Sequence, residues 1–285
     1  MIDFVCVGGN KCGTTWLYKM IKQHPKLNVS VNKEPSYFSH HYQRGEDWYL
    51  ENWNSDERPR GEFSTSYLYS DAAIRRMSED CPHVRVIVLL RHPIERAISH
   101  ARHLMRSGIF DDGKHVLADR PEVINNSRYA DRIKKLENVF GSDHVFVGFF
   151  PEIENAPSDL VTRVFSFLEV DPTFEPEGLH EVVGQGFDPK FPFLDRIRIN
   201  VYRILKDNGL YSFVQIIRGT GVTKLYKKVI DQSDNSYRIR EELEELLQKH
   251  LRSFCNDLDE LEEMSSITDK TYIRRWVSTM CNPPV

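Results

Sequence analysis

The fold is decided by Phe4-Val-Cys-Val7 and the turn that follows it, Gly8-Gly-Asn-Lys-Cys-Gly-Thr-Thr15. The apolar run predicts a buried strand, and apolar residues then recur with helical spacing between Trp16 and Ile21. A glycine-containing turn between a strand and a helix directs backbone N–H groups, and the positive end of the helix dipole, into one concavity. Because a phosphate group suits such a concavity, this stretch predicts an anion-binding loop.

The lysine of this loop is displaced from the place it has in a Walker A motif. Gly8 and Gly13 have the Walker spacing, but that motif ends in Gly-Lys-Ser/Thr so that its hydroxyl can hold magnesium. Here the loop ends in Gly13-Thr14-Thr15, and Lys11 lies in the middle of the turn. The variant predicts a phosphate-like anion that is bound without an obligatory metal.

A second motif follows another apolar strand run, Arg85-Val-Ile-Val-Leu-Leu90, and reads Arg91-His-Pro-Ile-Glu-Arg-Ala-Ile-Ser99. Pro93 suits the first turn of a helix, where its missing N–H would be unpaired in any case. The guanidinium of Arg91 and the hydroxyl of Ser99 can converge on a second phosphate. Ligands of open α/β sheets bind beyond the carboxyl ends of the strands, and we expect both motifs to lie there.

The alternation of strands and helices sets the fold class. We expect strands near residues 3–8, 28–32, 85–90 and 144–150, and helices near 14–23, 70–79, 94–106, 128–139 and 158–168. This order predicts an α/β protein with a P-loop-containing three-layer fold, in which helices flank a central, mostly parallel sheet. We expect irregular loops over 107–127 and 178–193, the first of them a candidate lid over the acceptor.

Composition bounds the class of protein. With 285 residues, of which 40% are hydrophobic, one substantial core is expected, and we predict a single domain over residues 1–285. The net charge of −4 gives no overall field for nucleic acid. A basic segment over 190–228 is interpreted as a solvated helix face, with an anionic acceptor or a membrane surface as the alternative partner. No apolar run reaches transmembrane length and no signal peptide precedes the first strand, so we expect a cytoplasmic protein.

The cysteines predict reduced thiols. They are Cys6, Cys12, Cys81, Cys255 and Cys281, an odd number without a Cys-x-x-Cys pair. Cys12 lies inside the anion loop, where neighbouring cations can activate a thiol. We favour the simpler interpretation, a small residue that fits the turn.

The two motifs together resemble those of the sulfotransferases that use 3′-phosphoadenosine 5′-phosphosulfate (PAPS) as donor. Lys11-Cys-Gly-Thr-Thr-Trp16 is similar to the 5′-phosphosulfate loop of that family, and the 91–99 segment to its 3′-phosphate motif. The resemblance extends through residues 32–38, 61–67 and 129–133 and covers most of 1–175. It is greatest to the branch that contains heparan sulfate sulfotransferases and their bacterial relatives. Residues 1–175 are accordingly expected to bind the donor, and 176–285 to form the acceptor, lid and helical part.

The resemblance implies a donor site built from both motifs. We expect it to contain Gly9, Asn10, Lys11, Cys12, Gly13, Thr14, Thr15, Trp16, Arg91 and Ser99, with Arg128 and Lys190 as further ligands. Lys11 is suited to stabilise the charge that develops on the leaving phosphate, so no metal is expected. The product left in the site would be 3′-phosphoadenosine 5′-phosphate (PAP).

Removal of the acceptor's proton points to Glu34. The glutamate of a short Lys-Glu…Phe motif is the general base in the resembling branch, and Lys33-Glu-Pro-Ser-Tyr-Phe38 is similar to it. Lys33 would orient Glu34 or contact the sulfuryl oxygens. His40 and His41 are the rival bases, since another sulfotransferase branch uses histidine.

One departure from the family bears on the acceptor. Heparan sulfate enzymes usually carry Glu-Lys-Thr where this chain has Glu62-Phe63-Ser64, so a cation near the reacting centre is absent or supplied from elsewhere. We therefore expect an acceptor less charged than heparan, a hydroxyl or amine of a carbohydrate, lipid or small natural product. Acceptor contacts are expected from Phe38, His40, His41, Phe63 and Tyr67. The sequence leaves the acceptor's identity and the oligomeric state open.

Two other functions compete with sulfuryl transfer. A P-loop kinase using ATP and magnesium is disfavoured by Gly13-Thr14 in place of Gly-Lys, and by Arg91 where a Walker B strand ends in aspartate. A nucleotide-binding protein without catalysis is the non-enzyme alternative. The presence of both Lys11 and Glu34 speaks against it, since a pure binder needs no base.

Overall fold

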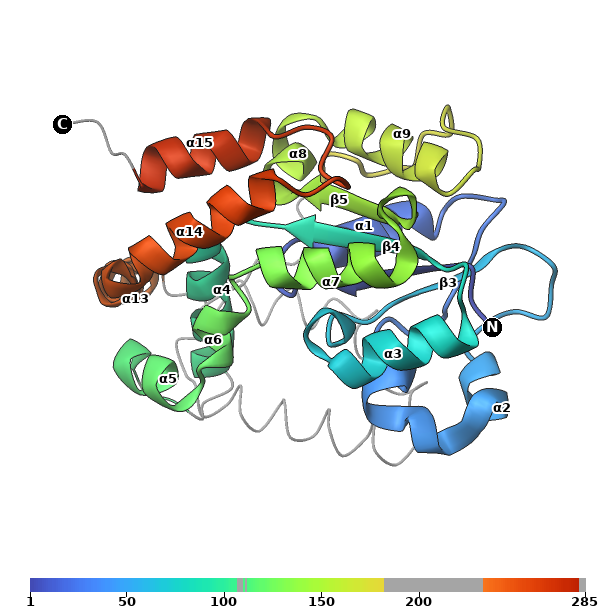
Figure 1. Ribbon diagram of the computed structural model, residues 1–285, viewed down its shortest axis with the longest axis horizontal. Coiled ribbons are helices and arrows are strands. Elements are labelled where there is room, and N and C mark those ends of the chain that lie inside the picture. The colour runs from blue at the N-terminus through green and yellow to red at the C-terminus, as the bar shows by residue number, and fades with distance from the viewer. Residues whose placement is uncertain (107–109, 111, 182–232, 282–285) are drawn as a thin grey trace. The chain divides into compact units, whose positions relative to one another are not determined.

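A five-stranded parallel sheet forms the centre of the protein. The computed structural model describes residues 1–106, 110, 112–181 and 233–281. The sheet has the strand order β2-β3-β1-β4-β5, with β1 in the middle (Figure 1). The strands are β1 (Phe4–Gly8), β2 (Asn28–Val29), β3 (Arg60–Phe63), β4 (Arg85–Leu90) and β5 (Val145–Phe149). Because all five run in the same direction, their carboxyl ends meet at one edge.

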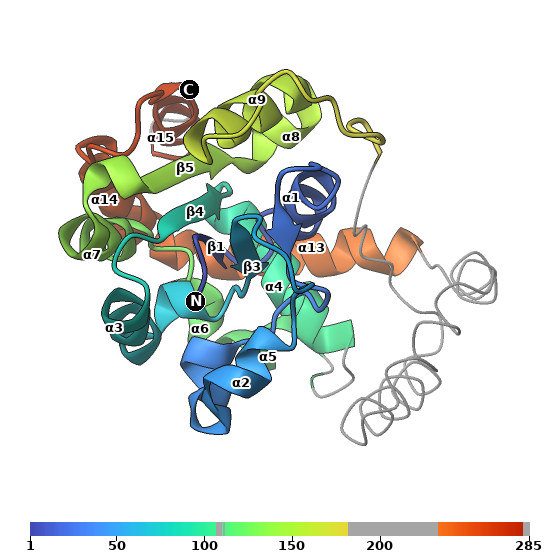
Figure 2. The same cartoon turned by 90° about the vertical axis from the view of Figure 1, so that its right-hand side faces the viewer.

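Helices cover both faces of this sheet, as the three-layer prediction requires (Figure 2). One face carries α1 (Thr14–Ile21) and α9 (Pro157–Phe167), and their apolar residues share one core with β1 and β4. The other face carries α3 (Asp71–Asp80) and α7 (Ala130–Phe140). The predicted α/β fold class is confirmed.

The remaining elements of this part of the chain are short or lie near its end. They are α2 (Gly45–Leu50), α8 (Phe150–Asn155), α14 (Leu251–Glu262), α15 (Thr271–Met280), a π-helical turn (Tyr37–His41) and 3-10 turns at Tyr42–Arg44, Tyr67–Tyr69, Ser142–His144 and Gln248–His250. Helix α14 packs on α7 and α15 packs on α14. Within the described residues, no helix combines the length and the apolarity needed to cross a bilayer.

Strand β3 was not among the expected strands. Its sequence, Arg-Gly-Glu-Phe, contains two charged residues, whereas a strand in the middle of a parallel sheet is usually a continuous apolar run. The structure nevertheless buries Glu62 completely. The four other strands and the five expected helices are present, with ends shifted by a few residues.

By their contacts, the residues form two compact units. The first comprises the described residues of Met1–Arg96, Asn126–Gly184 and His250–Val285, and the second those of Ala97–Asn125 and Gln185–Lys249. Helix α4 (Pro93–Arg106) begins in the first unit and continues in the second, which also contains α5 (Gly113–Asp119), α6 (Glu122–Asn125) and α13 (Ser233–Leu247). Residues 107–127, expected as an irregular loop, thus contain two short helices. The single sulfotransferase domain stays a prediction, and the basic segment 190–228 lies outside the described residues.

The prediction that all cysteines are reduced is wrong for two of them. Cys255 in α14 and Cys281, directly after α15, form a disulfide, while Cys6, Cys12 and Cys81 are free and buried. The pairing was hidden in the sequence because the two cysteines are separated by 26 residues. They meet because α14 and α15 pack against each other.

Candidate active site

The predicted anion loop joins β1 to α1. Gly13 is the N-cap of α1 and has a φ of 89°, and among the described residues no side chain caps the helix there. A Cβ atom at Gly13 would lie 2.3 Å from Ile153 Cδ1, so Ile153 would have to move, and the positive φ would strain any side chain there. The first N–H groups of a helix, here those of Thr14 and Thr15, have no acceptor within the helix. They give the loop the donors that an anion needs.

Lys11 holds a backbone conformation that is rare for a residue with a side chain. Its φ is 66°, in the left-handed region, which costs about 1–2 kcal/mol for a residue other than glycine. Its carbonyl accepts a hydrogen bond from Arg91 Nη1 at 3.4 Å. The two predicted phosphate motifs therefore meet, because they leave the neighbouring strands β1 and β4 at the same edge.

Arg91 is held from several sides. Its guanidinium lies 4.4 Å from the ring centre of Phe150 and 3.4 Å from the carboxylate of Glu95. Its own carbonyl accepts a hydrogen bond from the hydroxyl of buried Tyr129 at 2.8 Å. A partly exposed guanidinium fixed in this way is suited to bind phosphate.

Arg96 was not predicted, and it links both motifs from below the surface. Its side chain is completely buried; Nε donates to Ser127 Oγ at 2.6 Å and Nη1 donates to Asn10 Oδ1 at 2.7 Å. The hydroxyl of Ser127 donates a hydrogen bond to the carbonyl of Pro93 at 2.8 Å. The sequence signal was an arginine inside the buried stripe of a helix, where a charge needs partners.

Other predicted donor residues have different placements. Trp16 is buried, and its indole donates to the carbonyl of Leu179 at 3.1 Å, so its side chain packs in the core. Arg128 is exposed. Ser99 is half-buried on the part of α4 that belongs to the second unit, and Lys190 lies outside the described residues.

Cys12 does not have the environment of an activated thiol. Its side chain is completely buried, and this burial raises its pKa to about 11 despite the nearby guanidinium groups of Arg96 and Arg91. The thiol is therefore protonated at neutral pH. The structure agrees with a small residue that fits the turn.

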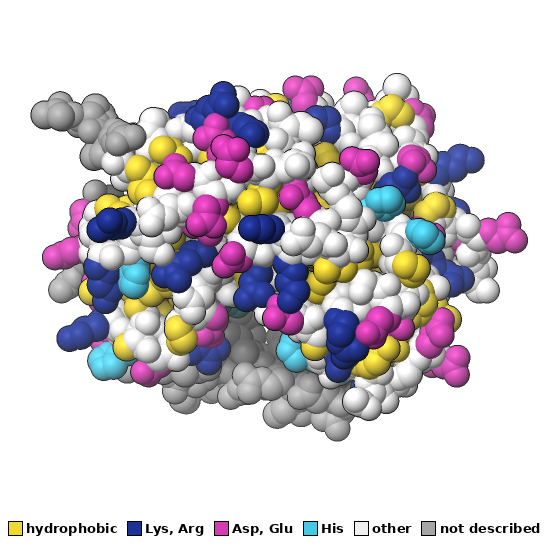
Figure 3. Space-filling model, in the orientation of Figure 1, with side chains coloured by type: hydrophobic (Ala, Val, Ile, Leu, Met, Phe, Trp, Pro, Cys, Tyr) yellow, Lys and Arg dark blue, Asp and Glu magenta, His cyan; other side chains and the backbone are white. Residues whose placement is uncertain are grey.

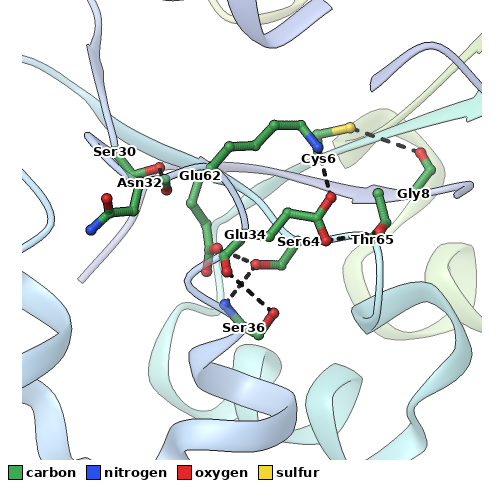
Figure 4. A network of polar contacts seen from close by, with 10 residues as sticks. Cys6, Gly8, Ser30, Asn32, Glu34, Ser36, Glu62, Ser64 and Thr65 are labelled. Atoms are coloured by element: carbon green, nitrogen blue, oxygen red, sulfur yellow. Dashed lines mark hydrogen bonds and ion pairs between the residues drawn. The ribbon is translucent and has the colours of Figure 1, made fainter. Parts of the chain in front are cut away.

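The candidate base Glu34 also has a left-handed backbone, with a φ of 65°. Its Oε1 lies 2.6 Å from Lys33 Nζ, and its Oε2 accepts a hydrogen bond from Thr65 Oγ1 at 3.0 Å (Figure 4). Its backbone N–H donates to the carbonyl of Phe63 at 2.8 Å. The side chain of Glu34 is 39% exposed. Its carboxylate is therefore open to a bound molecule, while Lys33 and Thr65 fix its orientation.

A second glutamate, Glu62, lies next to this base in the interior (Figure 4). It accepts hydrogen bonds from the hydroxyls of Tyr49 at 2.5 Å, Tyr67 at 2.7 Å and Ser64 at 2.6 Å. Burial raises its pKa to about 7, although the three hydroxyls lower it. Glu62 had no role among the sequence predictions, since burial of a carboxylate in a strand has no signal in one sequence.

Three of the residues expected to contact the acceptor lie in the interior. Phe38, Phe63 and Tyr67 are all completely buried. Phe63 packs edge-on against Tyr18, and Phe38 packs edge-on against Tyr67, so these rings shape the interior beside the site. His40 and His41 are exposed at the end of a π-helical turn.

The face shown in Figure 3 carries charges of both signs, with Lys and Arg side chains interspersed with Asp and Glu. The described residues contain no cluster of three or more His, Cys, Asp or Glu side chains that could hold a metal ion.

Comparisons with known proteins identify the family of this chain. The model of the sulfotransferase domain matches residues 2–185. The bifunctional heparan sulfate N-deacetylase/N-sulfotransferase 1 of Caenorhabditis elegans is 27% identical over 254 residues, which cover 75% of this chain and 30% of that protein. The membrane-associated sulfotransferase kil1 of Dictyostelium discoideum is 31% identical over 102 residues, 34% of this chain and 22% of that protein.

A solved structure is also similar along most of its length. The crystal structure of a sulfotransferase from Alicyclobacillus acidocaldarius is 27% identical, with a TM-score of 0.58, and the match covers 65% of this chain and 87% of that one. This chain spans less than a third of the length of the two curated relatives. Since the domain model matches more than half of the chain, the chain belongs to the sulfotransferase domain family.

Proposed function

We propose that this chain transfers a sulfuryl group from PAPS to a hydroxyl or amine of a carbohydrate, lipid or small natural product. The observation that carries the proposal is the left-handed backbone at both Lys11 and Glu34. Strain at residues other than glycine persists only where the surroundings impose it, and it concentrates at functional sites. Here it occurs at the two residues to which the chemistry assigns a cation and a base, and also at Ser36 and Glu169.

Each residue has a task that its placement supports. The uncapped start of α1 and Lys11 would hold the 5′-phosphosulfate, and Lys11 would stabilise the charge on the leaving phosphate. Arg91 would bind the 3′-phosphate. Glu34 would remove the acceptor's proton, with Lys33 and Thr65 holding its carboxylate in place.

The acceptor is proposed to be less charged than heparan. Phe63, which replaces the lysine of the heparan sulfate enzymes, is completely buried and supplies no cation.

The expected cytoplasmic location stays a prediction. The Cys255–Cys281 disulfide speaks for an oxidising compartment, since disulfides rarely persist in the cytosol.

Calorimetric titration with PAP and with ADP, with and without magnesium, tests the donor. We expect magnesium-independent binding of PAP that weakens by about tenfold to a hundredfold in Arg91→Ala, the loss of a charge-assisted pair. Arg85→Ala is the matched control. The side chain of Arg85 is 28% exposed and that of Arg91 is 22% exposed, but Arg85 begins strand β4 whereas Arg91 follows its carboxyl end. Magnesium-dependent preference for ADP would replace this proposal with a kinase.

Turnover of labelled PAPS tests the base in the same set of variants. The acceptors would be an amino-sugar oligosaccharide, a long-chain alcohol and a phenol. Glu34→Gln should lower kcat by about a hundredfold or more and leave PAP affinity unchanged, whereas His40→Ala and His41→Ala should retain turnover. A histidine variant that loses turnover while Glu34→Gln keeps it would reassign the base. Binding of PAP without turnover of any acceptor or of water would favour the non-catalytic protein.

A further inference from the structure

Glu62 belongs to a chain of hydrogen bonds that ends on the backbone around Glu34. Two of its three hydroxyl partners continue to that backbone. Ser64 Oγ accepts a hydrogen bond from the N–H of Ser36 at 2.9 Å. The Tyr67 hydroxyl accepts one from the N–H of Phe38 at 3.1 Å. The third partner, Tyr49, has no such continuation within the described residues, where its hydroxyl donates to Glu62.

In its ionised form Glu62 fixes the direction of these bonds. A hydroxyl has one proton, and an ionised carboxylate can only accept. When Glu62 accepts hydrogen bonds from the hydroxyls of Ser64 and Tyr67, the lone pairs of both hydroxyl oxygens are left to accept hydrogen bonds from other groups. The N–H groups of Ser36 and Phe38 lie at those positions.

The segment held in this way is the one that needs support. Glu34 and Ser36 both have positive φ, at 65° and 54°. Each left-handed residue without glycine's freedom favours relaxation to another conformation. Hydrogen bonds at Ser36 and Phe38, two and four residues beyond Glu34, oppose that relaxation.

We propose that Glu62 is a positioning residue for the reaction, which acts through Ser64 and Tyr67 to hold the turn that carries Glu34. Glu62 itself is completely buried. This inference rests on the proposed function, in which Glu34 is the base. It assigns to a buried glutamate of β3 the role of setting where that base points.

Tyr67→Phe and Tyr49→Phe form a matched pair of tests. Each removes one hydroxyl that donates to the same oxygen of Glu62, and each keeps the ring, but only Tyr67 continues to the N–H of Phe38. Glu62→Gln is a third variant, because its amide nitrogen places donors against Ser64 and reverses one bond of the chain.

Two measurements read out the result. Amide hydrogen exchange should accelerate by about tenfold, the factor of one lost hydrogen bond, at Phe38 in Tyr67→Phe and at Ser36 in Glu62→Gln. Neither amide should change in Tyr49→Phe. In the same two variants kcat should fall by about tenfold or more, while PAP affinity stays within about twofold because Lys11 and Arg91 are untouched. Turnover is measured with the best acceptor of the panel above, or with water if none reacts.

The outcomes separate this inference from the proposed function. Equal exchange and equal kcat in Tyr67→Phe and Tyr49→Phe would overturn the positioning role. If Glu34→Gln retains full turnover, the proposed base is wrong, yet the exchange at Ser36 and Phe38 still decides whether Glu62 holds the turn. Loss of PAP affinity together with kcat would show a general structural role instead.

Discussion

Buried polar side chains determine the geometry around the candidate site at the scale of single residues. Arg96 and Glu62 are both completely buried and of opposite charge, and each is satisfied by partners on other elements. Arg96 connects the anion loop to the start of α4, and Glu62 connects β3 to the turn at Glu34. An unpaired charge in either position would cost several kcal/mol, so the partners cannot be removed singly without effect.

The buried carboxyl of Glu62 makes stability depend on pH. Its pKa is raised from 4.5 to about 7 in the folded protein, so the folded state retains a proton that the unfolded state loses between these values. Stability should therefore be greatest below about pH 4.5 with respect to this group and fall as pH rises through 7, by about 3 kcal/mol at most. Urea unfolding of wild type and Glu62→Gln from pH 4.5 to 8 measures the effect.

The comparison is made as a difference between the two proteins, which cancels groups that titrate in both. The free energy of unfolding of wild type should decrease relative to Glu62→Gln across this window. A difference that is constant with pH would show that Glu62 keeps an ordinary pKa.

At the scale of elements, the sequence revealed strands and helices whose apolar pattern is regular. The apolar runs of β1 and β4 and the loops after them were predicted, because a continuous apolar run followed by a glycine or proline signal has few other interpretations. Strand β3 was not predicted because Glu62 interrupts its apolar pattern. The burial of this glutamate is stabilised by hydrogen bonds from hydroxyls at three other positions. Helices α5 and α6 were missed because they are short and polar; the N-cap of α5 is the side chain of Asp112.

Helix α7 depends on a residue from a distant helix. Asp257 in α14 accepts hydrogen bonds from the N–H groups of Tyr129, at 2.6 Å, and Ala130, at 3.1 Å. It thus caps the start of α7 from outside, in place of a local side chain. The sequence could not show this, since 128 residues separate Asp257 from Tyr129.

Asp257→Ala should lower the free energy of unfolding by about 1–2 kcal/mol, the usual value of an N-cap. Burial also raises the pKa of Asp257 to about 6, which makes the group weaker as a charged cap but leaves its two hydrogen bonds. Asp259→Ala is the control, because it removes the same charge from an exposed position of the same helix. Equal midpoints of urea unfolding for the two variants would argue against the cap.

At the scale of the whole molecule, the end of the chain is tied into the first unit. Helix α15 places Trp276 against the rings of Phe149, at the end of β5, and His92, beside Arg91. The Cys255–Cys281 disulfide joins α15 to α14. Sequence resemblance ended near residue 175, so both helices were expected only as part of the acceptor, lid and helical part over 176–285.

Reduction of the disulfide should lower the thermal midpoint. A loop of 26 residues corresponds to about 3–4 kcal/mol in the loop-entropy model. Scanning calorimetry with and without dithiothreitol measures the shift. The double variant Cys255→Ser/Cys281→Ser should melt at the lower midpoint under both conditions. A wild-type midpoint that is insensitive to dithiothreitol would contradict the expected contribution.

The cap at Asp257 has a consequence for the evolution and exchange of parts in this family. The region that family comparison recognises ends at residue 185, but a helix of that region starts on a carboxylate that lies 72 residues later. The segment recognised by the family model is therefore shorter than the segment that supplies the hydrogen-bond partners of its helices. A chimera that takes its final third from a relative would inherit a foreign partner for Tyr129, and with it a changed support for the carbonyl of Arg91. Sequence differences in the final third of the chain would then alter the surroundings of Arg91, in the proposed donor site, without any substitution in that site.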